Sequence, residues 1–135
     1  MTGAFVGFCP VGSVHGRFQP FHNGHLEYLA AARAHCSFLW VGITQINIRA
    51  LAASPVDPHR EKPVNNPLTY FERAKLITAV LVDEGWPLSS FAIVPFPIED
   101  PVNLATFLDL SVPIFTTVYD DWNREKVRLL KETWI

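Results

Sequence analysis

Residues 37–44 read Ser-Phe-Leu-Trp-Val-Gly-Ile-Thr, and this nearly continuous apolar run is the strongest constraint on the fold. A strand that is apolar at successive positions has both faces covered, which is typical of parallel sheets. Three further short apolar segments, residues 11–16, 91–96 and 114–119, are each bounded by Gly, Pro or Asp. Such boundaries are typical of strands. We therefore expect four strands in a parallel arrangement.

Helical patterns alternate with these strands. Apolar residues recur at helical spacing over residues 23–35, and Thr69 with Glu72 forms a capping box that opens a second helix ending at Gly85. The apolar stripe of that helix comprises Leu76, Ile77, Val80 and Leu81. Shorter helical patterns cover residues 102–110 and 123–134. Because such alternation gives right-handed crossovers, the sequence predicts an α/β protein: a Rossmann-like, doubly wound parallel sheet of four to five strands with helices on both faces.

Length and charge narrow the possible functions. A chain of 135 residues has room for one core, so we expect a single domain over residues 1–135. Eleven Lys and Arg against thirteen Asp and Glu leave no basic field, which argues against nucleic-acid binding. No apolar stretch has the length of a leader or a membrane span, and we expect a cytoplasmic protein. Four Trp and ten Phe either fill the core or leave surface for a homo-oligomer.

The turn after the first predicted strand concentrates the chemistry. It reads Gly-Arg-Phe-Gln-Pro-Phe-His-Asn-Gly-His over residues 16–25. Ligands of such sheets bind beyond the carboxyl ends of the strands, and the start of a helix attracts anions. Gly16 and Gly24 leave room for a phosphate to approach the backbone. His22 and His25 lie three residues apart, so both imidazoles can donate a hydrogen bond to one phosphoryl group.

Two other interpretations of the histidine pair stay open. Both rings could be purely structural. They could also bind a metal, but no third Cys, Asp or Glu ligand lies near them in the sequence, so we predict no protein-held metal. The two cysteines, Cys9 and Cys36, form no Cys-x-x-Cys pair, so neither a zinc site nor a disulfide framework is indicated.

The motif Gly-Arg-Phe-Gln-Pro-Phe-His-Asn-Gly-His resembles the signature of the HxGH nucleotidyltransferase superfamily, and its wording is closest to archaeal-type nicotinamide-mononucleotide adenylyltransferases. Residues 66–73 and 94–98 also resemble segments of that group. The resemblance implies transfer of AMP or CMP from a nucleoside triphosphate to an acceptor phosphate, with Mg²⁺ and release of pyrophosphate. It implies that His22 and His25 hold the α-phosphate. The nucleotide-binding residues it implies are Gly16, Arg17, Phe18, Gln19, Phe21, Gly24, Asp121 and Arg124.

The sequence departs from the superfamily pattern in two places. A Ser/Thr-rich stretch followed by Arg, which grips the β- and γ-phosphates, has no counterpart before Ile135. Either the chain is a piece of a larger protein, or Arg124, Lys126 and Arg128 partly replace that stretch. After residues 94–98 the nicotinamide enzymes have an Asn and a Trp, whereas this chain has Asn103 and no Trp. Arg49, Arg60 and Lys62 therefore become candidates for binding a small anionic acceptor, with a solvated loop as the alternative.

Residues 116–126, Thr-Thr-Val-Tyr-Asp-Asp-Trp-Asn-Arg-Glu-Lys, resemble nucleotidyltransferases of phosphonate biosynthesis, which attach CMP to a small phosphonate. Two acceptors are thus expected with equal weight: nicotinamide mononucleotide with ATP, or a small phosphonate with CTP. In both cases the acceptor oxygen attacks the α-phosphorus in line. A non-catalytic, nucleotide-binding regulatory domain is the alternative of a different class.

Overall fold

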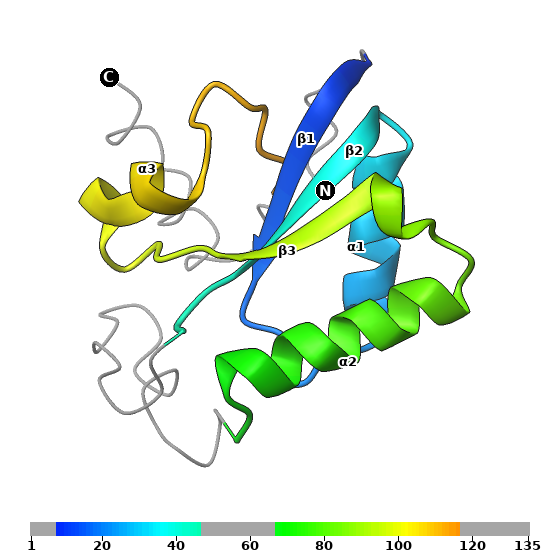
Figure 1. The fold of residues 1–135 in the computed structure, drawn as a ribbon, viewed down its shortest axis with the longest axis horizontal. Coiled ribbons are helices and arrows are strands. Elements are labelled where there is room, and N and C mark those ends of the chain that lie inside the picture. Colours follow the sequence, from blue (N-terminus) through cyan, green and yellow to red (C-terminus); the bar gives the residue numbers. More distant parts are fainter. Residues whose placement is uncertain (1–7, 47–66, 117–135) are drawn as a thin grey trace.

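The computed structural model describes residues 8–46 and 67–116. Within them, three parallel strands form one sheet in the order β1 (Cys9–Gly16), β2 (Cys36–Ile43), β3 (Phe91–Pro95) (Figure 1). The apolar run at residues 37–44 therefore lies almost entirely in the strand between the other two. The predicted parallel α/β arrangement is confirmed.

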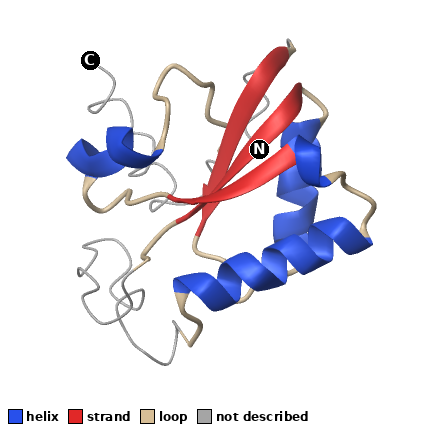
Figure 2. Cartoon of the chain, viewed as in Figure 1, coloured by secondary structure: helices blue, strands red, loops and turns tan. Residues whose placement is uncertain are grey.

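Helices connect the strands as the sequence predicts (Figure 2). They are α1 (Asn23–Arg33), α2 (Tyr70–Asp83) and the short α3 (Leu104–Phe107), with single turns of 3₁₀ helix at η3 (Leu88–Ser90) and η4 (Pro101–Asn103). The capping box that opens α2 is confirmed, because Thr69 Oγ1 accepts from the Glu72 N–H at 3.1 Å and Glu72 Oε1 accepts from the Thr69 N–H at 3.0 Å. The helix predicted over residues 102–110 is shorter, since Leu108 is already extended.

The two faces of the sheet carry separate apolar cores. On β2, Leu39, Val41 and Ile43 point to the core shared with α1 and α2, whereas Trp40 packs on the opposite side against the cluster that includes Leu104 of α3. Helices thus cover both faces, as predicted. On α2 the core contacts come from Ile77 and Leu81, but Leu76 is exposed, and the predicted stripe was wrong at that position. The fully buried Arg73 replaces it on the inner face.

On the edge of β1 away from β2, the chain adds a further segment to the sheet. Ser13 forms a parallel bridge with Ile114, in which the Ser13 N–H donates to Pro113 O at 2.9 Å and the Phe115 N–H donates to Ser13 O at 2.8 Å. The chain therefore passes from β3 to the far side of β1, which makes the carboxyl end of β1 the topological switch point. The rest of the predicted strand 114–119 and the helix 123–134 lie outside the described residues.

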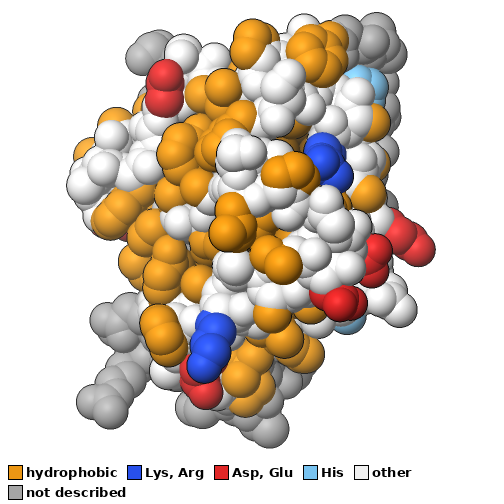
Figure 3. Space-filling view, turned by 45° about the vertical axis from the view of Figure 1, so that its right-hand side comes forward, with side chains coloured by type: hydrophobic (Ala, Val, Ile, Leu, Met, Phe, Trp, Pro, Cys, Tyr) orange, Lys and Arg blue, Asp and Glu red, His pale blue; other side chains and the backbone are white. Residues whose placement is uncertain are grey.

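The described surface is rich in apolar side chains. The face in Figure 3 carries a broad band of hydrophobic groups with few charges. Large exposed apolar residues include Phe8, Phe71, Leu88 and Val102. Self-association stays a prediction. Among residues 8–46 and 67–116, no helix has the length and apolar character needed to cross a bilayer.

Candidate functional site

The predicted turn lies at the carboxyl end of β1 and leads into α1. His22 is the N-cap of α1, and its Nδ1 accepts from the Gly24 N–H at 3.1 Å. His25 Nδ1 accepts in turn from the His22 N–H at 3.2 Å. The two rings stack with centroids 3.7 Å apart and an interplanar angle of 24°. The structure therefore brings the two predicted histidines together at the start of one helix.

These hydrogen bonds assign the tautomer of each ring. A neutral imidazole that accepts at Nδ1 carries its proton on Nε2. The sequence suggested that the free N–H groups of the helix would bind an anion, but two of them, those of His22 and Gly24, bind the imidazoles instead. On each ring the Nε2–H is thus the group that does not cap the helix, and the positive end of the helix dipole lies beside it.

Phe18 and Phe21 pack against the His25 ring from the core side. Both side chains are buried in the core on the α1 side of the sheet. The Phe18 ring meets the His25 ring edge-on at 4.9 Å between centroids, and the Phe21 ring lies 5.6 Å from it. Their side chains therefore fix the His25 ring, and at these two positions only the backbone is left to line the site.

The two glycines of the turn have packing reasons of their own. A Cβ at Gly16 would lie 2.7 Å from the Phe18 ring, which is held there by a backbone with φ of 53°. A Cβ at Gly24 would lie 3.0 Å from Cε1 of His22. Gly16 thus admits the phenylalanine below the histidines, and Gly24 admits the capping imidazole.

Gln19 joins the turn to the start of α2. Its Nε2 donates to Leu68 O at 2.8 Å, and its Oε1 accepts from the Leu68 N–H at 2.9 Å. Both ends of the amide are engaged with one backbone unit 49 residues away. The side chain of Gln19 therefore holds the loop in place, and the backbone of this residue is the part left for a ligand.

Arg73 is the residue that the sequence analysis missed. It is fully buried, and its guanidinium donates to Arg17 O at 3.0 Å, Thr44 O at 2.8 Å and Gln45 O at 2.9 Å. It thereby ties α2 to the chain at the carboxyl ends of β1 and β2. The segment 66–73 was the available signal, because Arg73 ends the motif that resembles the nicotinamide enzymes.

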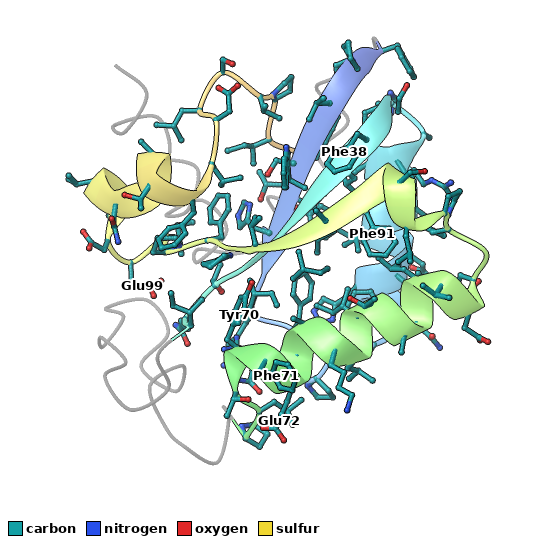
Figure 4. All side chains as sticks on the ribbon, in the orientation of Figure 1. Phe38, Tyr70, Phe71, Glu72, Phe91 and Glu99 are labelled. Carbon is teal, nitrogen blue, oxygen red and sulfur yellow. The ribbon has the colours of Figure 1, made fainter. Side chains whose placement is uncertain are left out.

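Burial, together with the charge of Arg17, lowers the pKa of Arg73 to about 10, so its guanidinium stays charged at neutral pH. Figure 4 shows Tyr70 extending from the first turn of α2 toward this end of the sheet, with Phe71 and Glu72 on the outer side of that turn. Burial raises the pKa of the Tyr70 phenol, so this side chain, unlike Arg73, is neutral at ordinary pH. The charges of both Arg17 and Glu99 act on Arg73, and the N-terminus of α1 adds the positive end of a helix dipole to this end of the sheet.

The remaining predicted residues are not brought to this end by any described contact. Asn103 is exposed, and its Oδ1 accepts from Thr106 Oγ1 at 2.8 Å on the α3 side of the sheet. Arg49, Arg60, Lys62, Asp121 and Arg124 lie outside the described residues. Within residues 8–46 and 67–116, no three His, Cys, Asp or Glu side chains are grouped so that they could hold a metal ion.

The described residues form a Rossmann-like α/β domain whose candidate site lies at the carboxyl end of its first strand, at the start of a helix capped by two histidines. Comparison with known proteins then names the family. The cytidylyltransferase-like family model matches residues 14–126, and the chain belongs to that family.

Two relatives illustrate the range of the family. The chain is 41% identical over 116 residues to phosphonoformate cytidylyltransferase of Streptomyces viridochromogenes, covering 86% of this chain and 63% of the relative. It is 33% identical over 118 residues to nicotinamide-nucleotide adenylyltransferase of Saccharolobus solfataricus, covering 87% and 61%. The chain thus spans about three-fifths of the length of these two relatives.

A solved structure confirms the fold. A bifunctional NMN adenylyltransferase/ADP ribose pyrophosphatase from Francisella tularensis superposes with a TM-score of 0.63 at 19% identity, over 91% of this chain and 36% of that one. At this identity the likeness concerns the fold alone. It agrees with the predicted Rossmann-like architecture.

Proposed function

We propose that this chain transfers a nucleotidyl group from a nucleoside triphosphate to a small phosphonate or phosphate and releases pyrophosphate. The observation that carries the proposal is the stacked pair His22 and His25, whose Nδ1 atoms cap α1, so that each neutral ring carries its donor hydrogen on Nε2. Two such donors suit a transition state that gathers negative charge on the non-bridging oxygens of one phosphorus.

The chemistry needs alignment more than proton transfer. An oxygen of the acceptor attacks the α-phosphorus, the new P–O bond forms as the bond to the β-phosphate oxygen breaks, and pyrophosphate leaves with the electron pair. A phosphonate or phosphate is already ionised at neutral pH, so no general base is required. His22 and His25 would hold the α-phosphate, with the backbone of residues 16–21 beside the phosphate chain.

Mg²⁺ fits this site as a partner of the triphosphate. Among the described residues, the Nε2–H groups of the two histidines and the cationic Arg17 suit phosphate oxygens rather than a metal, whereas the guanidinium of Arg73 is buried against backbone carbonyls. When bound to the triphosphate, Mg²⁺ neutralises the charge that develops on the departing pyrophosphate. The protein residues are left to orient the α-phosphate.

CTP with a small phosphonate is the pair that we place first, because the 41% identity to a phosphonoformate cytidylyltransferase exceeds the 33% identity to an adenylyltransferase. ATP with nicotinamide mononucleotide is the second candidate, and the adenylyltransferase relatives support it. The non-catalytic regulatory alternative gains no support, because both kinds of relative are named as transferases.

Several residue roles remain part of the proposal. Asp121 and Arg124 would contact the nucleobase side of the nucleotide. Arg49, Arg60, Lys62 and Asn103 would bind the acceptor. The organisation of residues 1–135 as one nucleotidyltransferase domain also remains a prediction.

A matrix of substrates tests the proposal. The protein is incubated with Mg²⁺, with CTP or ATP, and with phosphonoformate or nicotinamide mononucleotide, while pyrophosphate is measured and ³¹P NMR follows the product. We expect pyrophosphate only when triphosphate and acceptor are both present, with the CTP and phosphonoformate pair fastest. Binding of either triphosphate without pyrophosphate in any combination would contradict the enzymatic proposal and favour a binding domain.

A further inference from the structure

Tyr28 interrupts the pairing between β1 and the segment at Ile114. The first rung of this pairing is regular, since Ser13 exchanges hydrogen bonds with Pro113 and Phe115 at 2.9 Å and 2.8 Å. A parallel ladder would next join the His15 N–H to Phe115 O. Instead the Tyr28 hydroxyl accepts from the His15 N–H at 3.3 Å and donates to Phe115 O. A side-chain oxygen therefore occupies the place of a ladder bond.

The Tyr28 hydroxyl, in the place of a ladder hydrogen bond, spreads the backbones of His15 and Phe115 apart. A hydroxyl that bonds to both groups keeps them farther apart than a direct N–H···O bond would. The rung before it is closely packed, because a Cβ on Gly12 would lie only 2.7 Å from the Phe115 ring. The two segments thus pair directly at Ser13 and are bridged by the Tyr28 hydroxyl at His15, toward the carboxyl end of β1.

Tyr28 also connects this rung to the histidine pair. It lies on α1 one turn after His25, and residues three apart on a helix are neighbours. Its half-buried ring packs against the core on that side of the sheet. One side chain therefore sets the spacing at the switch point and anchors the helix that His22 and His25 cap.

We propose that Tyr28 is a positioning residue for the nucleoside triphosphate. Its hydroxyl holds the carboxyl end of β1 apart from Phe115 at the switch point, where ligands of doubly wound sheets bind. This inference rests on the proposed function, because it assigns the ligand as the triphosphate of that reaction.

The test is Tyr28→Phe, which removes the hydroxyl and keeps the ring. The matched control is Thr78→Val, which removes a hydroxyl that donates to Ala74 O within α2, away from the switch point. We expect KM for the triphosphate to rise about tenfold in Tyr28→Phe with kcat within about twofold, the pattern of lost uniform binding. Thr78→Val is expected to keep both constants. A wild-type KM in folded Tyr28→Phe overturns the inference.

Two further experiments cover the other outcomes. If Tyr28→Phe does not fold, Tyr28 is replaced by p-aminophenylalanine, whose amino group bridges the two backbone groups less well than a hydroxyl. A KM between the wild-type value and the tenfold higher value then supports the inference, and a wild-type KM overturns it. If the wild type binds CTP or ATP without turnover, the proposed function fails, and Kd takes the place of KM for Tyr28. If the wild type binds neither triphosphate, both proposals fail.

Discussion

The rings of His22 and His25 stack with centroids 3.7 Å apart, and each ring accepts a backbone hydrogen bond at the start of α1. Each histidine thus has a capping atom, Nδ1, and a second atom, Nε2, that carries the proton. The structural role and the proposed chemical role belong to different nitrogens of the same ring. Substitutions can therefore separate them.

Asparagine at position 22 and glutamine at position 25 keep the caps and delete the Nε2–H donors. Asn is among the best N-cap residues, and Gln at the third helical position completes a capping box. For His22→Asn and His25→Gln we expect turnover to fall about 100-fold or more, as when one oxyanion donor is lost. Stability is expected to stay within about 0.5 kcal/mol, whereas His22→Ala loses about 1 kcal/mol as well. Urea unfolding and pyrophosphate release measure the two effects, and wild-type turnover in both cap-preserving variants contradicts the role.

Gly16→Ala tests the support beneath the histidines. The new Cβ would lie 2.7 Å from the Phe18 ring, whose edge meets the His25 ring. Overpacking of this kind costs about 1–3 kcal/mol. We expect Gly16→Ala to lower both stability and turnover. In the double variant with Phe18→Leu the loss of stability should be smaller than the sum of the two single losses, since the residues share one contact. Strictly additive losses in urea unfolding argue against that contact.

Arg73→Met removes the buried donor that joins α2 to the ends of β1 and β2. The carbonyls of Arg17, Thr44 and Gln45 lose their charged partner. We expect a loss of about 3 kcal/mol or more in the free energy of unfolding. Lys75→Met, on the exposed side of the same helix, serves as the control and should change stability by about 0.5 kcal/mol at most. Equal changes in the free energy of unfolding for the two substitutions would show that the hydrogen bonds of Arg73 do not stabilise the fold.

Glu72 gives α2 a pH dependence of defined sign. Hydrogen bonds from the Thr69 backbone N–H and from its hydroxyl hold the pKa of Glu72 below its ordinary value of 4.5. A lowered pKa in the folded state means that the carboxylate stabilises the protein above about pH 4.5, and that this contribution is lost as the pH falls through the lower value. We expect the difference in Tm between the wild type and Glu72→Gln to shrink from pH 6 to pH 3. Parallel Tm curves contradict the assignment.

The sequence was a good guide where an apolar pattern or a local cap determines structure. The run at residues 37–44 predicted the strand between two parallel neighbours, and Thr69 with Glu72 predicted the start of α2. The capping box depends on residues three positions apart, and the apolar run depends on burial alone. Both can therefore be recognised from the sequence.

Arg73 and Tyr28 show what the hydrophobic pattern could not predict. A helical stripe assigns apolar residues to the core, so Leu76 was placed inside and Arg73 was not considered. The partners of Arg73 are backbone carbonyls, and those of Tyr28 are the backbone groups of His15 and Phe115, the latter 87 residues away. Backbone groups are present at every position and leave no trace in a sequence. The histidine caps were missed for a related reason, because histidine is not a preferred N-cap residue.

In the proposed reaction both imidazoles keep their proton on Nε2 and direct it at the triphosphate. Long-range ¹H–¹⁵N correlation spectra of the protein labelled at histidine measure this directly, without and with CTP or ATP, and the His22→Asn and His25→Gln variants assign the signals. We expect both rings to be Nε2–H tautomers and both Nε2 resonances to move when the triphosphate binds. Nδ1–H tautomers, or Nε2 resonances that stay unchanged with either triphosphate bound, would contradict this expectation.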